Sequence, residues 1–236
     1  MTITITTSNV NGIRAAKRKG IEQWAAKNTP DVWCMQEVRA PQNEIDPIFD
    51  EFGFEYATAG RIADQSGLDR MNEICRIKGR AGVGLLSALP VIDKRYGLPG
   101  LAEDVDSGRW IEADVKTPQG YTVTVVCVYV HAGNTDDPEK MKQKYRFLDT
   151  MLVRMGQLRD EAAHGGQQGA QVVALGRHKP QRAVHVDGGA LGDLAAAGLQ
   201  NGVGDLSGRH HVAADGQRKG RVKVPVRHRS PGGFQQ

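Results

Sequence analysis

The stretch YTVTVVCVYV, residues 121–130, constrains the fold more than any other part of the sequence. Apolar side chains occupy both of its faces, a pattern typical of a strand that is buried on both sides. It follows GRWIEADVKT (108–117) across a short PQG turn, so the two stretches predict a β-hairpin. A strand of this kind belongs inside a sandwich and not at its edge, so we expect a layered protein.

Other stretches predict the remaining layers. Thr and Ile alternate in TITITTSNV (2–10), which indicates a strand with one face in the core. The segment 14–30 predicts a helix that ends before Pro30, with Ile13, Ile21, Trp24 and Ala25 turned inward. Further strands are expected over 31–38, 53–59, 81–87 and 171–176, and the polar segment 61–79 is expected to be a loop. Strands that outnumber the intervening helices favour an α/β sandwich.

A long helix is expected after the hairpin. Its apolar stripe consists of Met141, Tyr145, Leu148, Leu152 and Met155, which recur at helical spacing. The basic residues off that stripe are interpreted as a solvated face, namely Lys140, Lys142, Lys144, Arg146 and Arg154.

Three polar groups follow predicted strands closely. Asn9 and Asn11 come at the end of the first strand, Glu37 ends the second, and Tyr129 lies near the end of the buried hairpin strand. If these strand ends meet at one edge of the sandwich, an amide oxygen and a carboxylate come together. Such hard oxygen ligands suit Mg²⁺ or Mn²⁺. Each residue alone also fits an ordinary turn, a solvated acid or a packed ring.

The order and spacing of several motifs resemble those of the exonuclease III family of DNA-repair nucleases, part of the endonuclease/exonuclease/phosphatase superfamily. The motifs are SNVNGIRA, PDVWCMQEVRA, GRAGVGLLS, DSGRWIEAD, VVCVYVHAGN and KYRFLDTML, and the resemblance runs from about residue 3 to Gly176. It implies a four-layer α/β sandwich of the DNase I-like kind. It also implies metal-dependent phosphodiester hydrolysis: cleavage 5′ to abasic sites, 3′→5′ exonuclease action and removal of 3′ blocking groups.

The resemblance assigns a role to each site residue. Asn9 and Glu37 match metal ligands of the family, with Mg²⁺ or Mn²⁺ as the implied ion. Tyr129 matches the tyrosine that contacts the scissile phosphate, which makes it the implied catalytic residue. Asn11, Arg14 and Arg109 lie where contacts to DNA, or support of the site, are implied. The implied partner is double-stranded DNA with abasic sites or 3′ ends, bound by a monomer.

The sequence changes character after Gly176. Residues 1–176 carry a net charge of −2, whereas 177–236 carry +6 and contain no Ile, Thr, Glu, Met, Cys, Trp or Tyr. The family continues here with Gly-Asp-x-Asn and ends with an Asp-His pair, but this chain continues Arg177-His178-Lys179. We therefore interpret 1–176 as a partial nuclease domain with an incomplete C-terminal half, and 177–236 as a Gly/Arg/His-rich tail outside the family, read out of frame or disordered.

Other interpretations of the tail were weighed. A disordered basic arm would bind nucleic acid through phosphate charge, which makes a non-catalytic nucleic-acid-binding protein the alternative function. A metal site built from His178, His185, His210 and His211 is disfavoured, because their spacing matches no known ligand pattern. A relative that acts on a phosphoester other than DNA is also disfavoured by the motifs. If the missing half exposes apolar surface, the chain is expected to be poorly stable and prone to aggregation.

Composition sets the expected cellular setting. Cys34, Cys75 and Cys127 are few, odd in number and far apart, which indicates reduced thiols and a cytoplasmic protein. No apolar run approaches the roughly 20 residues of a membrane span, and the first residues lack the pattern of a signal peptide, so no membrane partner is expected.

Overall fold

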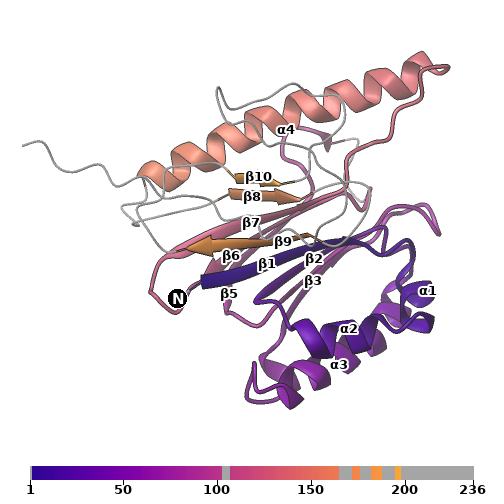
Figure 1. The fold of residues 1–236 in the computed structure, drawn as a ribbon. Helices are drawn as coiled ribbons and strands as arrows, with labels where there is room; N and C mark the ends of the chain where they lie inside the picture. The colour runs from indigo at the N-terminus through magenta and orange to yellow at the C-terminus, as the bar shows by residue number, and fades with distance from the viewer. Residues whose placement is uncertain (1, 103–106, 165–171, 176–181, 188–194, 198–236) are drawn as a thin grey trace, which may run out of the picture.

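The protein is a four-layer α/β sandwich, as the sequence predicted (Figure 1). The structure, a computed structural model, describes residues 2–102, 107–164, 172–175, 182–187 and 195–197. Two five-stranded sheets pack face to face. Helices α1 (Ile13–Arg18), α2 (Ile21–Asn28) and α3 (Gln42–Thr58) cover the outer face of one sheet, and α4 (Pro138–His164) covers the outer face of the other.

The first sheet has the strand order β3-β4-β2-β1-β9. Its strands are β1 (Thr2–Asn9), β2 (Val32–Gln36), β3 (Asp69–Glu73), β4 (Val83–Ser87) and β9 (Arg182–Asp187). The central strands β1 and β2 are parallel, and the other neighbours are antiparallel. The register of the parallel pair places Asn9 opposite Gln36, so both strands end at the same edge of the sheet.

The second sheet has the order β10-β8-β7-β6-β5. Its strands are β5 (Val91–Tyr96), β6 (Trp110–Lys116), β7 (Thr122–Val128), β8 (Val172–Leu175) and β10 (Ala195–Ala197). The antiparallel β6–β7 pair is the predicted hairpin, and β7 lies between β6 and the parallel strand β8. Every residue of β7 is buried, which confirms that this strand lies inside the sandwich.

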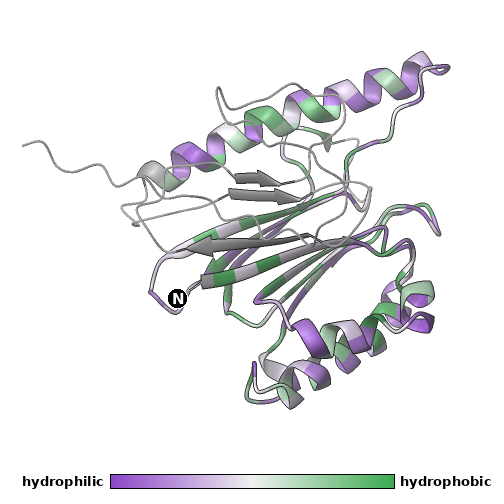
Figure 2. Ribbon diagram, viewed as in Figure 1, coloured by the Kyte–Doolittle hydropathy of each residue, from purple (hydrophilic) through white to green (hydrophobic). Residues whose placement is uncertain are grey.

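Three clusters of buried apolar residues lie between the four layers. Figure 2 shows hydrophobic residues recurring along the strands and helices of these layers. The central one joins residues of β1, β2 and β4 to residues of β6 and β7 across the two sheets. On the helical side of the first sheet, Trp33 packs against the rings of Trp24 and Phe52, with centroids 4.9 Å and 5.2 Å away. Burial on this scale, at about 25 cal/mol per Å² of apolar surface, holds the layers together.

Three expected elements differ from the structure. The helix predicted over 14–30 is two helices, because Gly20 takes a left-handed conformation (φ 80°) between them. The strand predicted over 53–59 falls in α3, whose buried residues include Phe49, Phe52 and Tyr56 at helical spacing. The expected loop over 61–79 contains a short 3₁₀ helix, η1 (Gln65–Gly67), and the strand β3, which pairs with β4.

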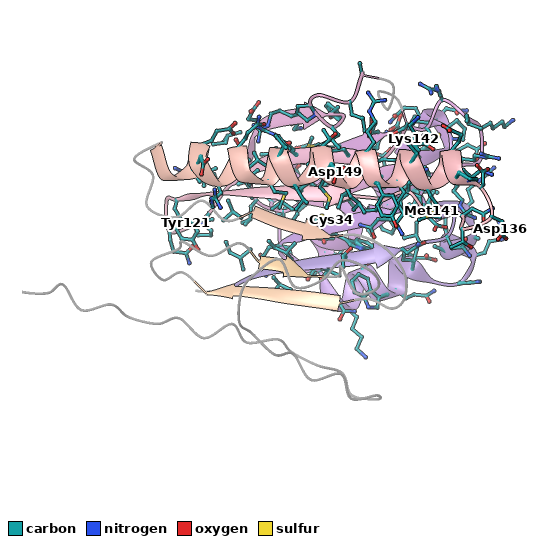
Figure 3. The ribbon with its side chains drawn as sticks, turned by 90° about the horizontal axis from the view of Figure 1, so that it is seen from above. Cys34, Tyr121, Asp136, Met141, Lys142 and Asp149 are labelled. Atoms are coloured by element: carbon teal, nitrogen blue, oxygen red, sulfur yellow. The ribbon has the colours of Figure 1, made fainter. Side chains whose placement is uncertain are left out.

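The buried face of α4 is rotated from the predicted stripe. Leu148 and Met155 are buried as expected, but Tyr145 and Leu152 are exposed. The helix instead packs through Phe147, Met151 and Leu158 beside those two. Arg154 was predicted to be solvated and is buried against Glu112 of β6, so that prediction is wrong. From above, α4 lies lengthwise over the molecule, with Lys142 and Asp149 among the side chains that it carries (Figure 3).

The segment 177–236 contributes two strands that no sequence pattern predicted. Strand β9 pairs with β1 along six residues, and β10 pairs with β8 along three. His185 lies in β9, opposite Thr4, while His178, His210 and His211 lie outside the described residues. A change of reading frame and a basic nucleic-acid arm both stay predictions. Among the described helices, none is long and apolar enough to cross a membrane.

Candidate active site

Strand ends bring three of the predicted site residues into direct contact. Asn9 ends β1, Glu37 follows the neighbouring strand β2, and Tyr129 follows β7 of the opposite sheet. The Glu37 Oε1 atom accepts hydrogen bonds from Asn9 Nδ2 at 2.9 Å and from the Tyr129 hydroxyl at 2.7 Å. The site therefore bridges the two sheets, and residues distant in sequence meet at one carboxylate.

Glu37 is the centre of this cluster. Glu37 is only 5% exposed. Its second carboxylate oxygen, Oε2, pairs with the guanidinium of Arg39, a residue that the sequence analysis did not select. A buried carboxylate keeps its charge only when it is paired and hydrogen-bonded, and these three donors meet that need.

The backbone around Glu37 is held on two sides. The carbonyls of Gln36, Glu37 and Val38 accept hydrogen bonds from the N–H groups of residues 10, 12 and 13, at 2.7–2.9 Å. On the other side, the Val38 N–H donates to the Gly82 carbonyl at 3.0 Å. Glu37 (φ 57°) and Arg39 (φ 52°) are left-handed within this ladder. Such backbone costs about 1–3 kcal/mol per residue and persists where the surroundings enforce it, often at functional sites.

Asn9 has both ends of its amide engaged. Its Nδ2 faces Glu37, and its Oδ1 accepts the backbone N–H of Asn11 at 3.0 Å. A carboxylate on one side and an N–H donor on the other fix the orientation of the amide. Asn11 itself is left-handed (φ 48°), which asparagine tolerates well, and its residue is exposed next to the cluster.

Tyr129 is held by Arg109. The Arg109 guanidinium donates to the Tyr129 carbonyl at 3.0 Å, and its central carbon lies 5.0 Å from the centre of the Tyr129 ring. Burial raises the pKa of the Tyr129 phenol, and its hydrogen bond to the Glu37 carboxylate raises the pKa further. The phenol is therefore a neutral hydrogen-bond donor at neutral pH.

Arg109 owes its position to a second acid that the sequence analysis missed. The Oε2 atom of Glu73, at the end of β3, accepts the backbone N–H groups of Arg109 and Trp110, both at 2.8 Å. The segment around Glu73 has no clear period, so its only advance signal was an acid shortly before the GRAGVGLLS motif. Arg109 supports the tyrosine here, and its contact with DNA stays a prediction.

Arg14 is not drawn into the cluster. It stands in the first turn of α1 and pairs with Glu44 of α3 at 2.8 Å, with half of its side chain exposed. The predicted DNA contacts of Arg14 and Asn11 stay predictions.

Gly108 brings the two sheets together beside the site. It has φ 69°, and its carbonyl accepts the Gly82 N–H at 3.0 Å. A Cβ at this position would lie 2.6 Å from the backbone N of Cys75 and 2.7 Å from that of Gly82. No other residue fits such an approach without moving backbone.

Gly108→Ala is therefore expected to destabilise the protein by about 2–4 kcal/mol, the sum of left-handed strain and overpacking. Chemical denaturation measures this. Gly120→Ala is the matched control, since Gly120 also has positive φ (92°) but nothing within 4 Å of its would-be Cβ. Only about 1–2 kcal/mol is expected there. Equal losses in the two variants would contradict the close approach at Gly108.

Comparisons with known proteins agree with this fold. Residues 6–211 match the Endonuclease/Exonuclease/phosphatase family, and the chain belongs to that family. The match extends past Gly176, the end of the resemblance in the sequence motifs.

Several solved structures share the fold. One is the 3′ phosphatase NExo from Neisseria bound to a product DNA hairpin, with 25% identity, a TM-score of 0.54, and coverage of 74% of this chain and 56% of that one. A second is the 3′-5′ exonuclease NExo from Neisseria meningitidis, with 26% identity, a TM-score of 0.51, and coverage of 74% and 57%. The catalytic domain of Xenopus laevis APE2 has the same fold at 20% identity, a TM-score of 0.51, and coverage of 74% and 57%. The aligned part of the chain spans little more than half the length of these proteins.

Proposed function

We propose that this chain is a metal-dependent DNA-repair phosphodiesterase of the exonuclease III type, acting on double-stranded DNA at abasic sites or 3′ ends. The observation that carries the proposal is the meeting of Asn9, Glu37 and Tyr129 at one buried carboxylate. The solved relatives support it, since one of them is a 3′ phosphatase bound to product DNA and another a 3′-5′ exonuclease.

The donor atoms present suit a hard divalent ion. Mg²⁺ keeps several waters and is bound through one or two carboxylates, so Glu37 fits Mg²⁺ or Mn²⁺. Asn9 turns its amide nitrogen toward Glu37, so its own role as a ligand stays a prediction. Among the described residues, no three His, Cys, Asp or Glu side chains lie together in a group that could hold a metal ion. That part of the chain therefore supplies no larger set of metal ligands. When bound, the ion would neutralise phosphate charge.

The residues of the chain itself have separable tasks. Glu37 would hold the ion, and Asn9 positions Glu37 through its amide N–H. Tyr129 would turn the one proton of its hydroxyl from Glu37 to a phosphate oxygen and donate a hydrogen bond there. Arg109 fixes the ring and backbone of Tyr129. No described residue near Glu37 is placed to activate water, a task that the family gives to the Asp of Gly-Asp-x-Asn. We propose that the chain as it stands is therefore impaired.

Glu37→Gln is the direct test, because it keeps the shape of the side chain and removes its charge. Binding of Mn²⁺ by the full chain, followed by electron paramagnetic resonance, is expected to weaken by at least about 100-fold. Glu44→Gln is the matched control, since Glu44 pairs with Arg14 on the helical layer, and its Mn²⁺ affinity should equal that of the unaltered chain. Equal affinity in the Glu37 variant would refute this metal site.

A further inference from the structure

Arg39 occupies the position on Glu37 that a cation would need. Its guanidinium pairs with Oε2, while Oε1 already accepts from Asn9 and Tyr129. Both oxygens of the carboxylate are thus engaged by donors of the protein. A metal ion that approaches Glu37 at Oε2 meets the Arg39 guanidinium there, and the three donors differ in how easily they can leave.

Asn9 and Tyr129 have little freedom to move. Asn9 ends a paired strand, and its amide is fixed at both ends. Tyr129 is half-buried, and the Arg109 guanidinium lies over its ring. Arg39 is different, because its side chain is 39% exposed against 7% for Glu37. The Arg39 side chain can therefore turn away from Glu37 into solvent.

The backbone restricts this motion to the side chain. The Arg39 N–H donates to the Ala81 carbonyl at 3.0 Å, and the preceding residue is hydrogen-bonded to both flanking segments. Rotation of the long side chain into solvent costs little, while the left-handed backbone that aims it at Glu37 stays in place.

We propose that Arg39 is the built-in counter-cation of the metal site, whose guanidinium neutralises Glu37 in the free protein and leaves when a divalent ion binds. The inference rests on the proposed function, in that it takes Glu37 as a metal ligand. Arg39 thereby sets the affinity for the ion: the charge keeps a buried carboxylate stable without metal, and each ion that binds must first break this pair. Arg39 acts through Glu37 and is therefore a positioning residue.

The test compares Mn²⁺ affinity of the full chain with that of Arg39→Gln, Arg39→Met and Arg39→Lys. Loss of a competing charge a few ångströms from the ion is expected to tighten Mn²⁺ binding about tenfold or more in the Gln and Met variants. Arg39→Lys keeps the charge and should stay within about threefold of the unaltered chain. Arg159→Gln removes an exposed positive charge on α4 and should leave the affinity unchanged.

A second readout follows Arg39 itself. In the unaltered chain, the Nε–H signal of Arg39 in an NMR spectrum is expected to move to the position of a solvated arginine as Mg²⁺ is added. The same titration of Glu37→Gln should not move that signal. This readout depends on binding alone and needs no turnover.

The outcomes separate the two proposals. Equal or weaker Mn²⁺ binding by Arg39→Gln and Arg39→Met, with binding lost in Glu37→Gln, would overturn the counter-cation and leave the metal site standing. Absence of Mn²⁺ binding in the unaltered chain and in all Arg39 variants would overturn both.

Discussion

A chain whose codons after Gly176 are read in the frame that restores Gly-Asp-x-Asn and the terminal Asp-His is expected to cleave abasic-site DNA at least about 10³-fold faster than the present chain. The physical reason is that a positioned general base alone contributes about 10²–10⁴-fold, and the restored acids also add to the metal shell. Cleavage of an abasic-site duplex in Mg²⁺, with and without EDTA, measures the difference between the two purified proteins.

The geometry of the present chain favours this outcome. Strand β8 is parallel to β7, and its Leu175 lies opposite Cys127, two residues before Tyr129. An Asp two positions beyond Leu175 in the restored chain is therefore expected at the edge where Tyr129 meets Glu37. Asn9, Glu37 and Tyr129 already meet at that edge, and strand β8 runs toward it beside β7.

The restored chain carries its own control. Glu37→Gln introduced into it should return cleavage to the level of the present chain, because both halves of the site are needed. Two results would contradict the prediction: coding DNA in which neither alternative frame encodes Gly-Asp-x-Asn followed by Asp-His, or equal Mg²⁺-dependent cleavage by the two chains.

Sequence patterns predicted those parts of the fold whose signal is local. The alternation in 2–10 and the doubly apolar stretch 121–130 have period two, and both are strands where expected. Asn9, Glu37 and Tyr129 could be selected because each lies at or just past the end of a predicted strand, and strand ends gather at sheet edges. Their contact across two sheets needed the register of the parallel β1–β2 pair.

The misses share a physical cause, which is packing between residues distant in sequence. The aromatic residues of 53–59 favour a strand locally, yet Tyr56 completes the buried face of α3 and donates to the Pro30 carbonyl at 2.8 Å. Glu73 accepts hydrogen bonds from backbone N–H groups 36 and 37 residues away. Arg39 looked like an ordinary basic residue. Its pairing with Glu37 depends on a left-handed backbone, which no local sequence pattern predicts.

Arg154 shows the same effect with larger energetic consequences. Its guanidinium donates to both oxygens of Glu112, each at 2.8 Å, and ties α4 to the second sheet. Glu112 is fully buried and also accepts from Arg95 at 2.7 Å and from the indole N–H of Trp110 at 3.0 Å. Burial acts to raise the pKa of Glu112, but hydrogen bonds from Arg154, Arg95 and Trp110 outweigh it and lower the pKa below its usual value.

Arg154→Met is expected to destabilise the protein by about 3 kcal/mol, since removal of one partner leaves a buried carboxylate short of counter-charge. Arg95 and Trp110 remain on Glu112, which keeps the loss at the low end of the range for broken buried pairs. Urea-induced unfolding at neutral pH measures it. Arg159→Met, on the same helix but exposed, is the control and should change stability by no more than about 0.5 kcal/mol.

The pair also predicts a dependence on pH and on the second partner. Because the folded state lowers the pKa of Glu112, its contribution to stability is present above the unfolded value of about 4.3 and is lost as the pH falls through the folded value. Glu112→Gln should therefore lose less stability on acidification than the unaltered chain.

Replacing both partners, as Glu112→Leu with Arg154→Met, should recover most of the loss of Arg154→Met, because two apolar side chains leave fewer buried charges unpaired. If the double variant is no more stable than Arg154→Met, the unpaired charge of Glu112 is not the cause of the loss, and the pair stabilises the fold in another way.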